Sequence, residues 1–532
     1  MSEESKMIEE EKSGEILTAF ARIPYALISQ EVEGSSRDLL LELTEICKYY
    51  KVYKKGKKFT VEGTNGDYVP SALRYKMSSS LINKEARFLF AETPDIVVEP
   101  KGDLGKITEE AKNALTVLND LVKSVLDANK FEEALIKAAK DCFIGKRVAG
   151  VINFNEEDGV TISFIPSTQF VYETKLGNPN VITKFVCWFV AKESMQLVEK
   201  KIFKKKFVLE NRNGKNVVFL EEALYDGRGA LIEQVTEYQE TLLDEIPAVV
   251  FINDGLTGEK DGESEIEILQ WYEEYYSKLS NADMDGERKS MNPIRYTVDM
   301  ESNSTKNLSS SAGSQWDLGS DQNLDNAHPM VGMLEPSMNY SEALKTTLDR
   351  IKTTGYEQVD MPNITLESMQ GAITSGKALK AIYWPLIVRC KEKMKMWGPG
   401  LSSMVNIIIQ GALVYPDCVK MYTNDTIQPV DYEVSVTQNT PLPEDEMEEK
   451  NMDLAEVTAN TMSKKAYMKK WRGLTDDEVQ EELEQIAFER QMVEDVSFNG
   501  AFGNSNEDVP YPEAETGSED NNPVSGEETT VM

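Results

Sequence analysis

The stretch YSEALKTTLDRIKTTGYE (340–357), QVDMPNITLESMQGAITSG (358–376) and KALKAIYWPLIVRCKEKMKMW (377–397) decides how this sequence is interpreted. Its first part has leucine and isoleucine at helical spacing. Its second part cannot continue a helix through Pro362, because proline lacks an amide donor and clashes with the preceding turn. Its third part is a helix that we expect to end at Gly398-Pro399-Gly400. We therefore predict two helices around a long loop, and loops of this length are usually functional or disordered.

The predicted helix 377–397 combines apolar and basic residues. It is apolar nearly all round, so we expect it to be buried, and Pro385 should kink it. Its charged residues are almost all basic, in a chain of net charge −34. They either pair with acidic neighbours or form a cationic surface near a polyanion. The basic residues are Lys377, Lys380, Arg389, Lys391, Lys393 and Lys395.

Composition limits the possible functions of the chain. Its 532 residues are enough for two to four domains. The acidic charge argues against an outer surface that binds nucleic acid by bulk electrostatics, but not against a protein that encloses DNA without holding it tightly. No apolar run is long enough to span a membrane and no signal pattern opens the chain, so we expect a soluble, intracellular product.

Cysteine and histidine usage argues against common metal and nucleophilic sites. The five cysteines are scattered, with no CxxC pair, which fits a reducing compartment and not a zinc site. The only histidine, His328, lies in the turn-like stretch DNAHPMVG, where we expect it to face solvent. A histidine-rich metal site is excluded, and we predict no metal and no cofactor.

The order of periodic segments indicates an α+β protein. Residues 1–35 are acidic and predicted to be peripheral, and helical patterns, interrupted by a short predicted strand at 96–98, then run to Gly145. The period then switches to two, which predicts strands of an antiparallel sheet to about residue 254. A helix over 264–290, strands in PIRYTVDM and MVGMLEP, and the helix from 339 predict a stalk with a small β-containing tip. Trp316 is the only large apolar anchor of the polar stretch between those strands.

The C-terminal part is acidic. Residues 431–438 alternate as a strand, and helical patterns follow Pro443. Residues 443–532 contain 24 acidic and 7 basic side chains, a net charge of −17, which is half of the chain's −34. The composition from about residue 498 predicts a disordered tail.

A search for catalytic groups finds no motif. No GxxxxGK[ST] occurs, and ITSGKALK lacks the glycine spacing of a phosphate-binding loop. Carboxylates cluster on the helix 264–290, where a solvated helix face explains them. A carboxylate-based hydrolase is the alternative, but we expect no enzymatic activity. The carboxylates are Glu263, Glu265, Glu267, Glu273 and Glu274.

Several segments in order carry a family resemblance. They are IPSTQFVYE, EIPAVVFIN, DGESEIEILQWYEEYYSKLSNADMD, ITSGKALKAIYWPL, YEVSVTQNTPLPEDEMEE, SKKAYM and DDEVQEELEQI. Over roughly residues 70–495, the chain resembles the portal proteins of long-tailed bacteriophages. That resemblance implies a ring, usually of twelve subunits, at one capsid vertex. DNA would pass through it during packaging and ejection, and the packaging motor and tail connector would dock on it.

The resemblance also implies a division of the chain. By position, it comprises a peripheral segment (1–35), a wing of helices and antiparallel sheet (36–255), a first stem helix (256–290), a clip (291–338), a second stem helix (339–356), a tunnel loop (357–376), a long kinked helix returning to the wing (377–439), a helical crown (440–497) and a tail (498–532). The basic helix would then be a strut, packed against acidic neighbouring subunits, that holds each loop in the channel.

Site residues and partners follow from the same resemblance. Candidates for contact with DNA are Gln358, Asn363, Thr365, Ser368 and Gln370, with Lys377 and Lys380 as the nearest cations. Candidates for the clip docking surface are Trp316, Asp317 and His328. The implied partners are further copies of the chain, double-stranded DNA, the terminase large subunit, head-completion or tail adaptor proteins, and the major capsid and scaffolding proteins, with no membrane. The expected location is the virion portal vertex, with assembly in the host cytoplasm. A non-portal capsid scaffold or adaptor is the alternative.

Overall fold

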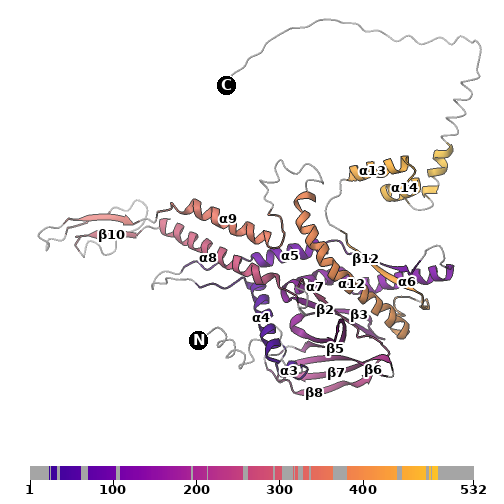
Figure 1. Ribbon diagram of the computed structural model, residues 1–532. Coiled ribbons are helices and arrows are strands. Elements are labelled where there is room, and N and C mark those ends of the chain that lie inside the picture. The colour runs from indigo at the N-terminus through magenta and orange to yellow at the C-terminus, as the bar shows by residue number, and fades with distance from the viewer. Residues whose placement is uncertain are drawn as a thin grey trace, which may run out of the picture. The chain divides into compact units, whose positions relative to one another are not determined.

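Figure 1 shows the computed structural model of the chain. The structure describes residues 23, 25–32, 36–60, 70–102, 108–192, 194, 196–212, 214–255, 262–291, 294–301, 316, 318–320, 328–334, 337–363, 380–423, 425–439, 446–474, 478–480 and 482–488. The chain divides into two compact units, residues 1–442 and 443–532. Helices and strands are mixed, so the predicted α+β class is confirmed.

Helices precede the sheets in the first unit. They are α3 (Tyr25–Ser29), α4 (Ser36–Lys55), α5 (Met77–Leu89), α6 (Glu109–Ala128) and α7 (Phe131–Gly145). The start of α6 shows how local sequence sets where a helix begins. The Thr108 side chain accepts a hydrogen bond from the Ala111 amide, and Glu109 and Glu110 occupy the first turn. A capping oxygen and early carboxylates both favour a helix start there.

The prediction that residues 1–35 are peripheral is wrong for the segment around α3. Ile23, Leu27 and Ile28 are at most 3 % exposed. They pack with Trp188 and its neighbours in the sheet, and each such side chain contributes about 1.5–3 kcal/mol on burial. The acidic residues that dominate the first fifteen positions concealed this short apolar run.

The strands between residues 147 and 252 form two antiparallel sheets. The prediction of antiparallel strands is confirmed, but that of a single sheet is wrong. One sheet has the order β3-β2-β9 and the other β4-β5-β6-β7-β8, and a cluster of buried side chains joins them. A turn at Ser167–Gln169 separates them directly after Pro166, which cannot donate to a ladder. The strands are β2 (Arg147–Asn155), β3 (Gly159–Pro166), β4 (Phe170–Lys175), β5 (Asn178–Lys192), β6 (Lys201–Arg212), β7 (Lys215–Asp226), β8 (Leu231–Glu240) and β9 (Ala248–Ile252).

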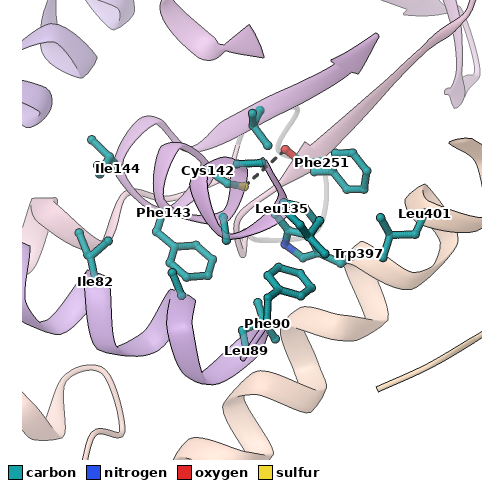
Figure 2. Close-up of a cluster of buried hydrophobic side chains, with 14 of the residues drawn as sticks. Ile82, Leu89, Phe90, Leu135, Cys142, Phe143, Ile144, Phe251, Trp397 and Leu401 are labelled. Carbon is teal, nitrogen blue, oxygen red and sulfur yellow. Dashed lines mark hydrogen bonds between the residues drawn. The ribbon is translucent and has the colours of Figure 1, made fainter. Parts of the chain in front are cut away.

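The long helix α12 (Trp384–Val414) crosses the main core of this unit. Figure 2 shows Trp397 between the Phe251 and Phe90 rings. Its ring stacks on Phe251 at 4.4 Å between centroids and meets Phe90 edge-on at 5.1 Å. The Cys142 thiol lies 3.6 Å from the Phe251 carbonyl oxygen. Helix, sheet and helical layer thus meet at one aromatic cluster.

The predicted end of this helix at Gly398-Pro399-Gly400 is wrong, because α12 continues to Val414. The glycines serve close packing instead of termination. A Cβ on Gly400 would lie 2.5 Å from Cε1 of Phe251, and one on Gly411 would overlap the Phe154 ring. Helix–sheet packing along this surface therefore needs both residues to lack side chains.

The start of α12 also differs from expectation. Pro385 was predicted to kink a continuous helix, but it lies in the first turn of α12, where its missing donor costs nothing. Nor is the start buried all round: Trp384 is 56 % exposed, and Ile382 and Val388 are also exposed. Some apolar side chains at the start of α12 are therefore left exposed by the rest of the described chain.

The predicted stalk elements are present. Helices α8 (Glu265–Met291) and α9 (Ser341–Glu357) lie side by side, with β10 (Ile294–Val298) and β11 (Met330–Leu334) joined to their far ends (Figure 1). The two strands pair antiparallel, with Tyr296 opposite Gly332. The periodicities of 3.6 and 2 predicted these elements to within two residues.

Two further parts complete the chain. Strand β12 (Tyr432–Thr437), which was predicted, pairs antiparallel with β1 (Asp95–Pro100). In the second unit, α13 (Glu446–Thr458) and α14 (Lys464–Arg472) confirm the predicted helices, and residues 478–480 and 482–488 are also helical. The predicted tail, 498–532, lies outside the described residues.

Candidate functional site

A ladder of polar side chains on α8 binds the extended segment 70–76. The side chains recur every four residues along the helix, and the bonded amides recur every two residues along the extended chain. Four helical residues rise about 6 Å and two extended residues about 6.8 Å, so the two repeats nearly match. The rungs are Ser71 N to Asp285 Oδ1 (3.0 Å), Leu73 N to Asn281 Oδ1 (2.8 Å) and Tyr75 N to Ser277 Oγ (3.0 Å).

Glu273 is the innermost member of this ladder. Its carboxylate accepts hydrogen bonds from the Lys57 amide (2.7 Å) and from the amide and hydroxyl of Ser78 (2.9 and 2.7 Å). Burial raises the pKa of Glu273, and these donors oppose that shift. Glu273 was predicted to lie on a solvated helix face, and its complete burial shows that prediction to be wrong.

A second group of charges joins α5, α8 and α12. Glu85 and Glu265 face Arg389 and Lys393, and all four side chains are at least five-sixths buried. Arg389 contributes Nε at 2.8 Å from Glu85 and Nη2 at 2.6 Å from Glu265. The Lys393 ammonium lies 2.7 Å from Glu85 and 2.6 Å from Glu265. These four residues are called the ion cluster below.

The ion cluster is electrically balanced, with two carboxylates and two cations. Burial alone would raise the pKa of Glu265, but Lys393 and Arg389 outweigh it and lower that pKa to about 2. The Lys393 ammonium also lies 3.7 Å from the centre of the Phe143 ring. Such a cluster adds little net stability compared with apolar packing, but losing one member leaves a buried charge unpaired.

The ion cluster corrects two expectations about charge. Glu265 was predicted to be solvated and is instead buried in an ion pair. Arg389 and Lys393 were expected to face acidic neighbouring subunits, and they pair with carboxylates of their own chain. Lys391 and Lys395 of the same helix are exposed. The basic character of the helix therefore has an internal cause at two of its positions.

The predicted DNA-contact residues are only partly described. Gln358 is exposed and ends α9, with its amide bonded to the Thr354 carbonyl. Asn363 is half-buried, and its side-chain amide donates to Thr353 Oγ1 at 3.2 Å. Lys380 is exposed on a short helical turn. Thr365, Ser368, Gln370 and Lys377 lie outside the described residues, so their grouping with the other three stays a prediction.

The predicted docking residues lie near the strand pair. Trp316 is half-buried, and the Arg295 guanidinium lies 5.0 Å from the centre of its ring. His328 is exposed, as predicted, and its amide donates to Asp299 Oδ2 at 3.1 Å. Asp317 lies outside the described residues. The strands that flank this stretch add further apolar side chains to the tip. Tyr296, Val298, Met330, Val331, Met333 and Leu334 are exposed on β10 and β11.

An apolar stripe runs along the outer face of α8. Ile268, Trp271 and Tyr275 are 50–61 % exposed and follow one another at helical spacing. Trp271 and Tyr275 border a groove of about 450 Å³ between α8 and Ile351 of α9. Large aromatic side chains at this exposure are typical of a surface that a partner covers. The spacing was visible in the sequence, but which face of α8 stays open was not.

The described part of the chain holds no clustered metal ligands, and its cysteines are buried. There, no group of three or more His, Cys, Asp or Glu side chains could hold a metal ion. All five cysteines are buried as free thiols, and burial raises the pKa of Cys187 to about 12. Among the described helices, none is long and apolar enough to cross a membrane. Of the five carboxylates named for the hydrolase alternative, Glu273 thus belongs to the ladder and Glu265 to the ion cluster.

Comparison with known proteins identifies the family. A family model described as "Phage portal protein, SPP1 Gp6-like" matches residues 37–495. This chain belongs to the phage portal protein family. The match runs from α4 past α14, so it includes the helical layer, both sheets, the stalk, α12 and β12 of this portal protein. A search of curated proteins finds no match.

Family membership gives the portal protein a general role. The family is structural and not enzymatic, and it implies a ring oligomer at the capsid vertex of a phage, with capsid and packaging partners. Sequence reasoning found this family but missed the ladder and the ion cluster. Both leave a signal: a polar residue at every fourth position from Glu273 to Asp285, and Arg389 with Lys393 one turn apart in an apolar helix.

Proposed function

We propose that this portal protein forms the ring-shaped channel through which viral DNA is packaged and ejected, and that the ring is the docking platform for the packaging motor and the tail connector. The observation that carries the proposal is the family match over residues 37–495. The proposed parts are the wing (36–255), the stem (256–290 and 339–356), the clip (291–338), the tunnel loop (357–376), the strut helix and return (377–439) and the crown (440–497).

The apolar stripe of α8 supports the ring. Ile268, Trp271 and Tyr275 each leave at least half of the side chain exposed, although the Lys57 ammonium lies 4.7 Å from the centre of the Trp271 ring. A head-to-tail contact that repeats with a closing rotation buries the same stripe in every subunit of a ring. We assign the stripe to the contact between neighbouring stems.

The charge of the chain supports a channel that does not grip DNA. Each chain has a net charge of −34, so a ring of such chains would repel the DNA backbone from most of its surface. Cationic contacts bind DNA by releasing counterions and would slow its passage. The proposed contacts are therefore uncharged loop residues, namely Gln358, Asn363, Thr365, Ser368 and Gln370, with Lys377 and Lys380 as the nearest cations.

The tip is the proposed docking surface. An isolated two-stranded ribbon is marginally stable in water, yet β10 and β11 expose apolar side chains such as Met333 and Leu334. Coverage by a partner would stabilise such a ribbon. The proposed partners at Trp316, Asp317 and His328 are the terminase large subunit and the head-completion or tail adaptor proteins. The major capsid and scaffolding proteins are further proposed partners, with assembly in the host cytoplasm.

A packaging reaction tests the proposal. Purified procapsids that carry this protein would be supplied with motor protein, ATP and DNA, and the DNA protected from nuclease would be measured. We expect protection with the intact chain, and none with procapsids assembled without it. Equal protection in both would contradict the channel role and favour a scaffold or adaptor.

A further inference from the structure

Arg389 contacts carboxylates from three different parts of the chain. Its Nε lies 2.8 Å from Glu85 of α5 and its Nη2 lies 2.6 Å from Glu265 of α8. Its third nitrogen, Nη1, lies 3.7 Å from Oδ2 of Asp360. The planar guanidinium can reach three acceptors at once because its donors point in fixed, divergent directions. Lys393, the other cation of the ion cluster, contacts Glu85 and Glu265.

The third contact lies at a distinctive place in the sequence. Asp360 follows α9 in a left-handed conformation (φ 51°), between Val359 and Met361, whose side chains are buried in the main core. Arg389 belongs to the second turn of α12. One side chain therefore joins residues 358–363, which precede the segment 364–379, to the helix that follows it.

Neighbouring contacts also act on these two flanks. The Met361 amide donates to the Tyr356 carbonyl at 3.0 Å, and Asn363 bonds to Thr353. On the other flank, the Tyr383 ring stacks on Phe88 at 5.7 Å. Each of these contacts acts on one flank. Arg389 provides an ion pair that joins the two.

We propose that Arg389 is a positioning residue of the DNA channel, which sets where the chain leaves α9 and where it returns at α12. This inference rests on the proposed function, in which residues 357–376 form the tunnel loop. The alternative is that Arg389 only stabilises the core. The two differ in where disruption is felt: at both flanks for positioning, or evenly over α5, α8 and α7 for a core role.

Hydrogen–deuterium exchange on the full-length, assembled protein separates these roles. Asp360→Asn breaks the contact at the half-exposed carboxylate and leaves the buried pairs intact. Exchange over 358–363 should accelerate about two- to five-fold, as expected for loss of a partly exposed ion pair. Arg389→Lys keeps the charge but loses the fork, and both 358–363 and 380–388 should accelerate by roughly tenfold. Asp349→Asn on α9 and Lys391→Gln on α12, both at exposed positions, are the matched controls.

The same samples show what would overturn the inference. Unchanged exchange at 358–363 in both variants would overturn it, and so would an equal acceleration over α7. Packaging by the two variants is a separate measurement and should fall if positioning matters to the channel. Accelerated flanks with normal packaging would overturn the role of the loop in the proposed function, while the anchoring by Arg389 would stand.

Discussion

The ammonium of Lys393 on α12 lies 2.6 Å from Oε1 of Glu265 on α8, and both side chains are more than nine-tenths buried. This contact links the helix that crosses the core to the first helix of the stalk. The stalk and the core of the portal protein are therefore held together by charge as well as by apolar packing.

Lys393→Met should destabilise the protein by about 3–5 kcal/mol, because it leaves two buried carboxylates with a single cation. The measurement is chemical unfolding followed by circular dichroism. Lys395→Met removes an exposed cation from the same helix and should change stability by less than about 0.5 kcal/mol. Similar losses in both variants would show that the ion cluster has no special role.

Acid should weaken the ion cluster in a defined window. Because the pKa of Glu265 falls from 4.5 to about 2 on folding, its stabilising contribution is fully present above pH 4.5 and is lost as the pH falls toward 2. The full effect is roughly 3 kcal/mol. The thermal unfolding midpoint, measured from pH 6 to pH 3, should fall more steeply for the natural chain than for Glu265→Gln. Parallel curves would refute the assignment.

Asn281→Ala should release the extended segment from α8. The variant leaves the Leu73 amide and carbonyl without the side chain that bonds both, at a cost of about 1–3 kcal/mol. Proteolysis within residues 70–76 should become faster. Glu287→Ala, at an exposed position of the same helix, is the control and should be cleaved like the natural chain.

Trp271→Ala combined with Tyr275→Ala should weaken ring assembly. Aromatic side chains at the centre of an interface typically contribute about 2–4 kcal/mol each to the binding free energy. In sedimentation experiments the variant should therefore need a higher protein concentration than the natural chain to stay assembled as rings. Leu176→Ala is the control. The Leu176 side chain is 99 % exposed and far in sequence from α8, so its removal should leave assembly unchanged. Normal assembly of the double variant would mean that the α8 stripe does not face a neighbouring subunit.

Removing the loop should separate assembly from packaging. A deletion from Met361 would damage the core, because Met361 is buried there, so the deletion is best confined to 364–371. We expect rings of normal size and reduced DNA packaging or retention. Normal packaging would contradict the tunnel-loop assignment, whereas failed assembly would show that these residues take part in subunit contacts.

Local patterns predicted most elements of the portal protein. The periodicity of α8 and α9 and the alternation of β10, β11 and β12 depend on neighbouring residues, and these elements lie where the sequence indicates. The family, too, was visible in the order of its segments. The errors arose where distant residues decide the outcome. In the sequence, Gly400 has the pattern of a helix end. In the fold it lies against Phe251, and the helix continues.

The candidate site was harder to predict for the same reason. Glu265 and Glu273 have the sequence context of solvated carboxylates, but both are buried in the fold. Glu265 pairs there with Lys393, more than a hundred residues away, and Glu273 accepts a hydrogen bond from the Ser78 amide. The ion pair between Asp360 and Arg389 depends on how the chain folds between them, so the sequence alone does not indicate it. The uncharged loop candidates depend on the symmetry of a ring, which the sequence of one chain does not specify.

The most direct test of the channel is the mass and shape of the purified, full-length protein after assembly. Native mass spectrometry and electron microscopy of the same sample should give a closed ring, about twelve times the mass of one chain, with a central hole wide enough for duplex DNA. Monomers alone, or open filaments without a closed ring under assembly-favouring conditions, would contradict the account.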